Sequence, residues 1–204
     1  PREGEDEVRS VCMASLPPIL ESVGLGKVYP GPSRALSGAD LAVRSGEFIA
    51  VIGASGAGKS TLLRCMNRLV EPTEGRLLLD GRDVTRAHGA RLRRLRQRVG
   101  MIFQQFGLVS RLTVLQNVLA GRLRFARSPW RAGGSIARWF PEVDREAAMS
   151  RLELVGIADL AHKRASDLSG GQQQRVAIAR ALSQECGVIL AGGPIASRDP
   201  RSAE

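Results

Sequence analysis

The sequence predicts an α/β fold with a mostly parallel core sheet, and its most informative stretch begins with an apolar run. Residues 48–52 form this run, as a strand buried in a parallel sheet requires. A glycine-rich loop follows, after which apolar residues recur at helical spacing, namely Leu62, Leu63, Met66 and Leu69. Further apolar runs at 99–103 and 186–191 predict two more core strands.

The loop between this strand and this helix matches the phosphate-loop pattern G-x-x-x-x-G-K-[ST]. Its residues are Gly53, Ala54, Ser55, Gly56, Ala57, Gly58, Lys59 and Ser60. The N–H groups and the dipole at such a helix start favour an anion, and glycines let the backbone close around phosphates. Lys59 is placed to neutralise the β- and γ-phosphates, and Ser60 to bind Mg²⁺. A chance match in a glycine-rich turn is the alternative, but the flanking strand and helix favour a P-loop NTPase.

Composition narrows the classes of function. The 204 residues are 43% hydrophobic, enough for one domain with a subdomain. A formal net charge of +10 favours an anionic partner: nucleic acid, anionic lipid or a phosphate ligand. Charge alone is weak support for a nucleic-acid surface, and we expect no direct nucleic-acid binding. No apolar run approaches the roughly 18 residues of a bilayer-spanning helix. Cys12, Cys65 and Cys186 lack metal-site or redox spacing, which predicts buried or incidental thiols.

The chain is expected to contain a leader, a core and an insertion. Residues 1–18 predict a disordered leader, and residues 19–204 the folded domain. Residues 19–105 and 166–204 make up the predicted core, and residues 106–165 an inserted α-helical subdomain. Its apolar stripes are Val114, Val118 and Leu119 on one helix, and Ala148, Leu152 and Val155 on another. Between the stripes lie Trp130, Trp139 and Phe140, which form either a binding interface or part of the subdomain's own core.

An antiparallel β part is predicted before the core sheet. An edge strand is expected within residues 19–29, short strands at 35–36 and 39–43, and another strand at 76–81. Residues 89–98 predict a basic helix with Leu92 and Leu95 facing inward. Tyr29 precedes the phosphate loop by the distance expected of a residue that stacks on adenine, and a half-buried aromatic at a strand end is the equal alternative.

Residues 168–183 predict a second helix that begins in an anion-ready loop. Ser169 can cap this helix, and Gly170 and Gly171 free its backbone. Its inner stripe is Val176, Ala179 and Leu182. A single domain has little use for two γ-phosphate sites, so we expect this loop to serve the nucleotide of a neighbouring molecule.

Three features together resemble the ATP-binding subunits of ABC transporters. They are the loop GASGAGKS, Gln104 directly after a strand, and LSGGQ at residues 168–172. The resemblance covers residues 19–203 and looks closest to the ATP-binding subunits of phosphonate importers. The segments that suggest this branch are MIFQQFGLVSRLTVLQNVLAGRL, the insert with Trp130-Arg131 and Trp139-Phe140-Pro141, LSGGQQQRVAIARALSQ, and PIASRDPRSA.

The resemblance implies that two subunits pair head to tail around two ATP molecules. By this likeness Tyr29 stacks on adenine, residues from Gly53 to Thr61 hold the phosphates, and Lys59 and Gln104 serve catalysis. Ser60 and Gln104 approach Mg²⁺. The residues that face the partner's nucleotide are Ser169, Gly170, Gly171 and Gln172, and Asp199 lies in the loop that communicates across the dimer. Permease subunits would dock on the helical subdomain, which implies a peripheral position on the cytoplasmic face of the membrane and a role in solute uptake.

The sequence departs from the family pattern at three places. Gly192 and Gly193 stand where the family has Asp and Glu at the second phosphate-site strand. The Asp supports Mg²⁺ and the Glu activates water, a general-base role worth about 10²–10⁴ in rate. Glycine can do neither, so we expect impaired hydrolysis. Arg198 replaces a leucine, and the chain stops at Glu204 before the family's next strand and its switch histidine, which predicts a C-terminally truncated copy.

Three functions follow as alternatives. The first is the energising subunit of a phosphonate-type importer. The second is a nucleotide-binding module without catalysis, which the two glycines favour. The third is a soluble ABC protein that acts on nucleic acid, which the charge of +10 favours although such proteins usually carry two ATP domains.

Overall fold

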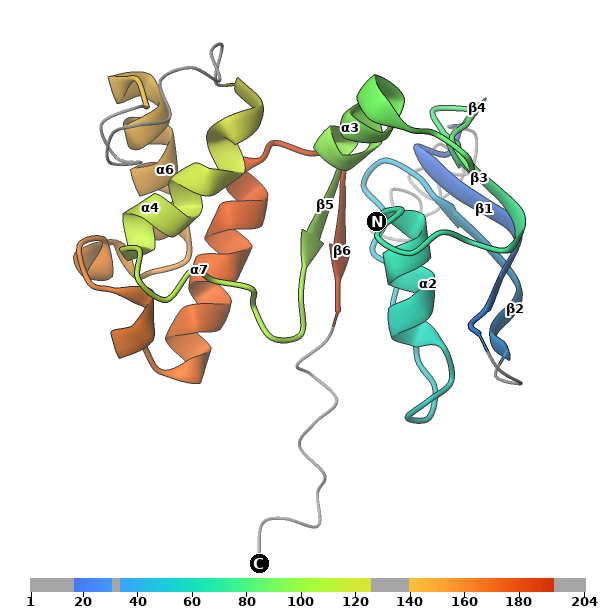
Figure 1. The fold of residues 1–204 in the computed structure, drawn as a ribbon. Coiled ribbons are helices and arrows are strands. Elements are labelled where there is room, and N and C mark those ends of the chain that lie inside the picture. Colours follow the sequence, from blue (N-terminus) through green and yellow to red (C-terminus); the bar gives the residue numbers. More distant parts are fainter. Residues whose placement is uncertain (1–16, 31–33, 126–139, 193–204) are drawn as a thin grey trace, which may run out of the picture. The chain divides into compact units, whose positions relative to one another are not determined.

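The computed structural model describes residues 17–30, 34–125 and 140–192. The chain divides into two compact units, residues 1–99 and 100–204 (Figure 1). The predicted leader lies almost wholly outside the described residues, as do Trp130, Trp139, Gly193, Arg198 and Asp199.

A four-stranded antiparallel sheet forms the frame of the first unit. Its order is β2-β1-β3-β4 (Figure 1). The strands are β1 (Leu20–Val28), β2 (Arg34–Val43), β3 (Glu74–Leu79) and β4 (Arg82–Asp83). Leu20 pairs with Val43 on one side and with Leu79 on the other. The antiparallel part is therefore confirmed, but β1 lies between β2 and β3 and is not the edge strand that the sequence predicts. The pattern of residues within a strand does not show whether the strand pairs on one side or on both.

Residues 48–52 do not form the predicted buried strand. No strand is assigned to them, and Phe48 and Ile52 are 94% and 91% exposed. A strand exists only where its N–H and C=O groups meet a neighbour, and no strand of the first unit's described residues pairs with this run. An apolar run alone does not make a strand, because the backbone also needs hydrogen bonds to a neighbouring strand.

Two helices complete the described part of the first unit. Helix α2 (Lys59–Met66) follows the phosphate loop and buries Leu62, Cys65 and Met66. Leu69 does not join this stripe and is 43% exposed, because the helix ends at Met66 and Arg68 adopts a left-handed backbone, with φ 53°. Helix α3 (Gly89–Arg98) has the predicted bounds.

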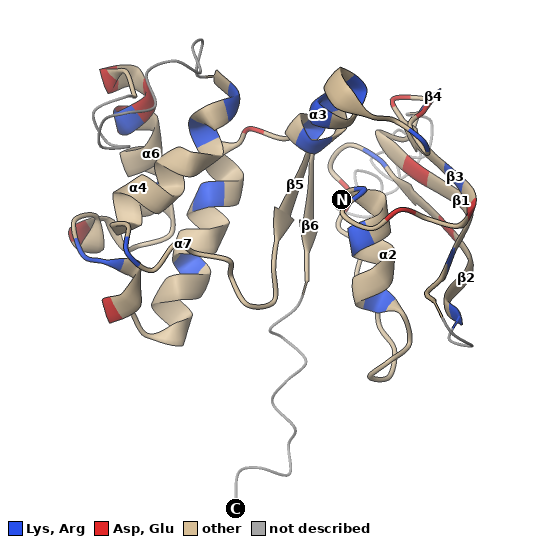
Figure 2. Cartoon of the chain, in the orientation of Figure 1, with Lys and Arg blue, Asp and Glu red and all other residues tan. Residues whose placement is uncertain are grey.

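The basic helix α3 behaves as predicted. Leu95 is fully buried and Leu92 half-buried, while its arginines are exposed and give α3 its blue bands in Figure 2. Arg98 pairs with Asp80 at 3.2 Å, and Arg96 donates to the Arg68 carbonyl at 2.9 Å. The Arg98–Asp80 ion pair is exposed and contributes less than about 1 kcal/mol to stability. Helix α3 is therefore held mainly by its leucines.

The second unit combines two strands with a helical cluster. Strands β5 (Val99–Ile102) and β6 (Val188–Ala191) pair and run in the same direction (Figure 1). The helices are α4 (Val114–Leu119), α6 (Glu142–Leu154) and α7 (Gly170–Ser183), with the 3₁₀ turns η1 (Ala120–Phe125), η3 (Ala158–Leu160) and η4 (Ala165–Asp167). None of the helices in the described ranges has the length and apolarity needed to cross a membrane.

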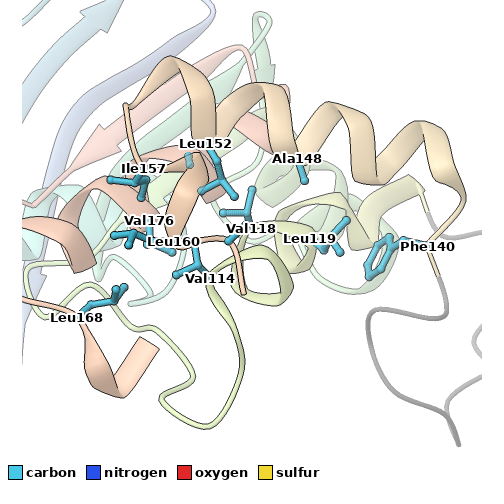
Figure 3. Packing of buried hydrophobic residues seen from close by; sticks show 12 residues of the cluster. Val114, Val118, Leu119, Phe140, Ala148, Leu152, Ile157, Leu160, Leu168 and Val176 are labelled. Carbon is cyan, nitrogen blue, oxygen red and sulfur yellow. The ribbon is translucent and has the colours of Figure 1, made fainter. Parts of the chain in front are cut away.

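One hydrophobic cluster joins α4, α6 and α7 (Figure 3). Val118 of α4, Leu152 of α6 and Val176 of α7 are each fully buried in it. The predicted stripes of α4 and α6 are confirmed, and Phe140 packs in the same cluster at 5% exposure. The cluster extends past the predicted subdomain boundary at residue 165, because α7 supplies one of its walls; the boundary itself stays a prediction.

The described cysteines are free and shielded. Cys65 is buried in the first unit and Cys186 is half-buried in the second. Burial raises the pKa of both thiols above the ordinary value, so little thiolate forms at neutral pH. For these two cysteines, this agrees with the prediction of buried or incidental thiols.

Candidate functional site

The phosphate loop is closed by a glycine that no other residue can replace without strain. Gly58 caps α2 with φ 85° and has no side chain to satisfy the first amides of the helix. A Cβ at this position would collide with the carbonyl oxygen of Ala35 on β2. Leu62 donates its backbone N–H to the Gly58 carbonyl at 2.8 Å. The amides of the first turn ahead of Leu62 are therefore left for an external acceptor.

Lys59 folds back over this loop. Its Nζ donates to the carbonyl oxygens of Gly53 and Ala54, both at 2.6 Å. The ammonium is thus held at the centre of the loop by neutral acceptors that a more negative phosphate oxygen can outcompete. No acidic residue lies in the first turn of α2. The positive charge of Lys59 and of the helix N-terminus is therefore not neutralised by a carboxylate in that turn.

Ser60 and Thr61 occupy the first turn of the same helix. Ser60 is exposed and Thr61 half-buried. The loop residues from Gly53 to Ala57 are exposed as well. The predicted phosphate-binding residues from Gly53 to Thr61 are therefore exposed or half-buried.

Tyr29 lies just past the end of β1. It is half-buried, and the Lys27 ammonium lies 5.3 Å from the centroid of its ring. This cation–π contact uses one face of the ring. Both sequence interpretations of Tyr29 remain compatible with this position.

In the second unit, Gln104 lies two residues past the end of β5 and is exposed. It lies beside the end of β6, because Gly192 donates its N–H to the Ile102 carbonyl at 2.9 Å. A Cβ added at Gly192 would lie 3.5 Å from the Ile102 oxygen and 3.6 Å from the Gln104 nitrogen. These are ordinary contacts, so the backbone here accommodates a Cβ next to Gln104.

The LSGGQ segment at residues 168–172, called the signature loop from here on, forms a well-capped start of α7. Ser169 caps α7 and accepts from the Gln172 amide at 3.4 Å, while the Gln172 side chain accepts from the Ser169 amide at 2.9 Å. This capping box uses two of the free donors. The amides of Gly170 and Gly171 remain, and an added Cβ on either glycine would meet nothing within 4 Å. The predicted anion-ready helix start is present, with Gln172 engaged in the cap.

The candidate site residues thus fall in two groups. Tyr29 and the loop through Thr61 belong to the first unit, whereas Gln104 and the signature loop belong to the second. Across the described parts of the chain, no group of three or more His, Cys, Asp or Glu side chains could hold a metal ion. Sequence reasoning missed Arg180, which donates hydrogen bonds to the turn that follows Gln104. The helical spacing of apolar residues does not show which arginine contacts a segment more than seventy residues earlier.

A phosphate loop at a helix start, with a second glycine-rich helix start in the same chain, defines a nucleotide-binding protein of the P-loop class. A family described as "ABC transporter" matches residues 36–196. The chain belongs to the ABC transporter family.

Relatives and solved structures agree with this assignment. The chain is 51% identical over 182 residues to "Phosphonates import ATP-binding protein PhnC" of Shouchella clausii, covering 89% of this chain and 67% of the relative. It is 57% identical over 174 residues to the protein of the same name in Rhodopseudomonas palustris, covering 85% of this chain and 63% of the relative. The chain therefore spans about two thirds of the length of these relatives.

Two solved structures have the same fold. CbiO1 from Clostridium perfringens, part of the ABC transporter complex cbiONQ, matches with a TM-score of 0.71 at 31% identity over 91% of this chain and 69% of that one. A dimeric bacterial ABC transporter cassette matches with a TM-score of 0.73 at 34% identity over 90% of this chain and 77% of that one. The predicted fold class, a P-loop ATPase with an antiparallel β part and helical additions, is confirmed.

Proposed function

We propose that this chain is the ATP-binding subunit of an ABC importer of the phosphonate type. The observation that carries the proposal is the phosphate loop, in which Lys59 Nζ is held 2.6 Å from the carbonyls of Gly53 and Ala54 at an open helix start. The names of the relatives support the importer and its substrate class. In this function Tyr29 stacks on adenine and the residues from Gly53 to Thr61 hold the triphosphate.

In this proposal, Mg²⁺ is an ion carried by the nucleotide. The protein ligands in the proposal are the Ser60 hydroxyl and the Gln104 side-chain oxygen, both neutral. Mg²⁺ commonly keeps several waters and takes phosphate oxygens as ligands, so neutral donors suffice to hold MgATP. When bound, the ion neutralises charge on the phosphates. The chain's own contribution is to place Lys59 and the first-turn amides of α2 around the same oxygens.

The subunit acts as one half of a head-to-tail dimer. Ser169, Gly170, Gly171 and Gln172 face the nucleotide held by the partner's phosphate loop. The open amides of Gly170 and Gly171 support this role, because they form an anion site that the chain's own loop does not need. Permease subunits dock on the helical subdomain, and the protein lies at the cytoplasmic face of the membrane.

Binding without efficient hydrolysis is the second candidate function. It is favoured by Gly192, which supplies no carboxylate at a position whose Cβ would lie 3.6 Å from the Gln104 nitrogen. In this second function the dimer closes on ATP and reopens slowly, because hydrolysis is slow. The chain would then act as a regulatory subunit of a transporter and not as its motor.

Replacing Lys59 tests nucleotide binding. Lys59→Ala is expected to weaken MgATP binding by roughly tenfold to a hundredfold, because it removes a charge-assisted hydrogen bond to phosphate. Isothermal titration calorimetry on the full chain measures this. Lys163→Ala removes the same charge from an exposed position of the second unit and should leave the affinity unchanged. Equal losses in both variants, or no binding by the wild type at millimolar ATP, would overturn the proposal.

A matched pair of cap variants tests the dimer. Thr113 caps α4 with the same capping box that Ser169 makes on α7. Ser169→Ala and Thr113→Ala are each expected to lower the free energy of unfolding by about 1 kcal/mol. Only Ser169→Ala should also weaken ATP-driven dimerisation, measured by analytical ultracentrifugation with and without MgATP. If both caps affected dimerisation alike, the signature loop would have only a structural role.

A further inference from the structure

Arg180 is a half-buried cation on α7 that finds backbone partners in place of acidic ones. Its Nη1 donates to the Gly107 carbonyl and its Nη2 to the Phe106 carbonyl, each at 2.6 Å. Among the described residues, its side chain forms no ion pair with a carboxylate. Burial lowers the pKa of Arg180 from its ordinary value. The two carbonyls are therefore the groups that replace water around this guanidinium.

The turn that Arg180 grips has an unfavourable backbone. Phe106 and Gly107 both have φ 57°. For Phe106, which has a side chain, the left-handed region is sparsely populated and persists only where surrounding contacts enforce it. Within the turn, the Phe106 amide donates to the Phe103 carbonyl at 3.0 Å and the Gly107 amide to the Gln105 carbonyl at 2.6 Å. Arg180 adds the two contacts from outside the turn.

The same turn carries Gln104. One end of it adjoins Gly192 through the hydrogen bond to Ile102. The other end leads to Val109, which is held by the buried Asn117 through its backbone N–H at 2.8 Å and its carbonyl at 3.1 Å. Arg180 contacts the stretch between these two anchors. Helix α7 thus reaches from its cap at Ser169 to the turn that presents Gln104.

We propose that Arg180 is a positioning residue that fixes the Gln104 turn to the helix that begins at Ser169. The signature loop and the Gln104 turn are then linked through α7, because the loop begins this helix and Arg180 of the same helix hydrogen-bonds the turn. This inference rests on the proposed function for its consequence, which is that Arg180 sets how well Gln104 meets nucleotide-bound Mg²⁺. The grip itself is a property of the folded second unit.

Hydrogen exchange on the nucleotide-free chain tests the grip. In Arg180→Met, the amides of Phe106 and Gly107 are expected to exchange at least roughly tenfold faster than in the wild type, since two hydrogen bonds to a charged group are lost. Arg180→Lys, with a single point donor, should be intermediate. Arg175→Met is the matched control, because Arg175 lies on the same helix and contacts the Val155 carbonyl at 3.3 Å, away from the turn.

A nucleotide measurement tests the consequence. The ratio of ATP affinities with Mg²⁺ and with EDTA should fall by roughly tenfold in Arg180→Met, while the EDTA affinity stays within about twofold of the wild type. Unchanged exchange at Phe106 and Gly107, or faster exchange spread equally over α4 and α6, would overturn the positioning role. An unchanged Mg²⁺ ratio would overturn its consequence. If the wild type bound no ATP, the proposed function would fail, and the exchange result would still decide the grip.

Discussion

Gly192→Asp combined with Gly193→Glu is expected to raise single-turnover ATP hydrolysis by about 10²–10⁴-fold. The wild type lacks both a carboxylate to support Mg²⁺ and a base to activate water at these positions. The double variant supplies both. The readout is release of inorganic phosphate with enzyme in excess over ATP.

The structure favours this restoration at Gly192. The backbone there is not in the left-handed region, and a Cβ would meet only ordinary contacts with Ile102 and the Gln104 nitrogen. The Cβ of an aspartate is therefore accommodated at this position, next to the Gln104 backbone. Gly193 lies outside the described residues, and its replacement by Glu rests on its place in the sequence, directly after Gly192.

Matched amides provide the control for the carboxylates. Gly192→Asn with Gly193→Gln adds nearly the same volume and the same hydrogen-bonding reach without negative charge or a base. This variant should leave hydrolysis at the wild-type rate while ATP affinity changes little. A rise of similar size in the amide variant, or none in the acid variant, would show that the missing carboxylates do not limit turnover.

Local signals predicted much of this chain well. The basic helix at residues 89–98 has the expected bounds, because Leu92 and Leu95 recur at helical spacing among arginines. The capped start of α7 follows from a serine placed three residues before a glutamine, the pattern of a capping box. Such features depend on neighbours within about one turn, and a sequence contains that information.

Most of the failures concern partners far apart in the sequence; Leu69 is the exception, because its helix ends locally at Met66. Residues 48–52 have the hydrophobicity of a buried strand but pair with no strand of the first unit's described residues. The prediction of β1 as an edge strand failed because β3, more than forty residues later, pairs with it. Arg180 reaches Phe106 across a sequence separation of 74 residues. Helical periodicity does not indicate which cation makes such a contact.

The same limitation hid an ion cluster in the second unit. Arg122 of η1 donates from Nε to Asp144 Oδ1 at 2.8 Å and from Nη1 to Glu185 Oε1 at 2.6 Å. The Arg122 and Asp144 side chains are only 9% and 10% exposed, whereas Glu185 is 44% exposed. Burial disfavours the charged guanidinium, but the hydrogen bonds it donates to Glu185 and Asp144 outweigh this and raise the pKa of Arg122. The cluster ties η1 to the first turn of α6 and to the end of α7.

Removing the buried carboxylate should therefore destabilise the second unit strongly. Asp144→Ala leaves the Arg122 guanidinium buried with only a half-exposed partner, and we expect a loss of about 3–5 kcal/mol in the free energy of unfolding. Chemical denaturation followed by circular dichroism measures it. Glu142→Ala is the control on the same helix turn, because it breaks an exposed pair with Arg145 at 3.5 Å and should cost less than about 1 kcal/mol.

The double variant separates charge from packing. Arg122→Met with Asp144→Leu removes both buried charges and keeps apolar volume, so stability should recover to within about 1–2 kcal/mol of the wild type. A deep loss in Asp144→Ala that the double variant reverses means that the unpaired cation, not the cavity, causes the damage. A loss that persists in the double variant would assign the effect to packing around Phe125, whose ring lies 4.3 Å from the Arg122 guanidinium and 4.4 Å from that of Arg124.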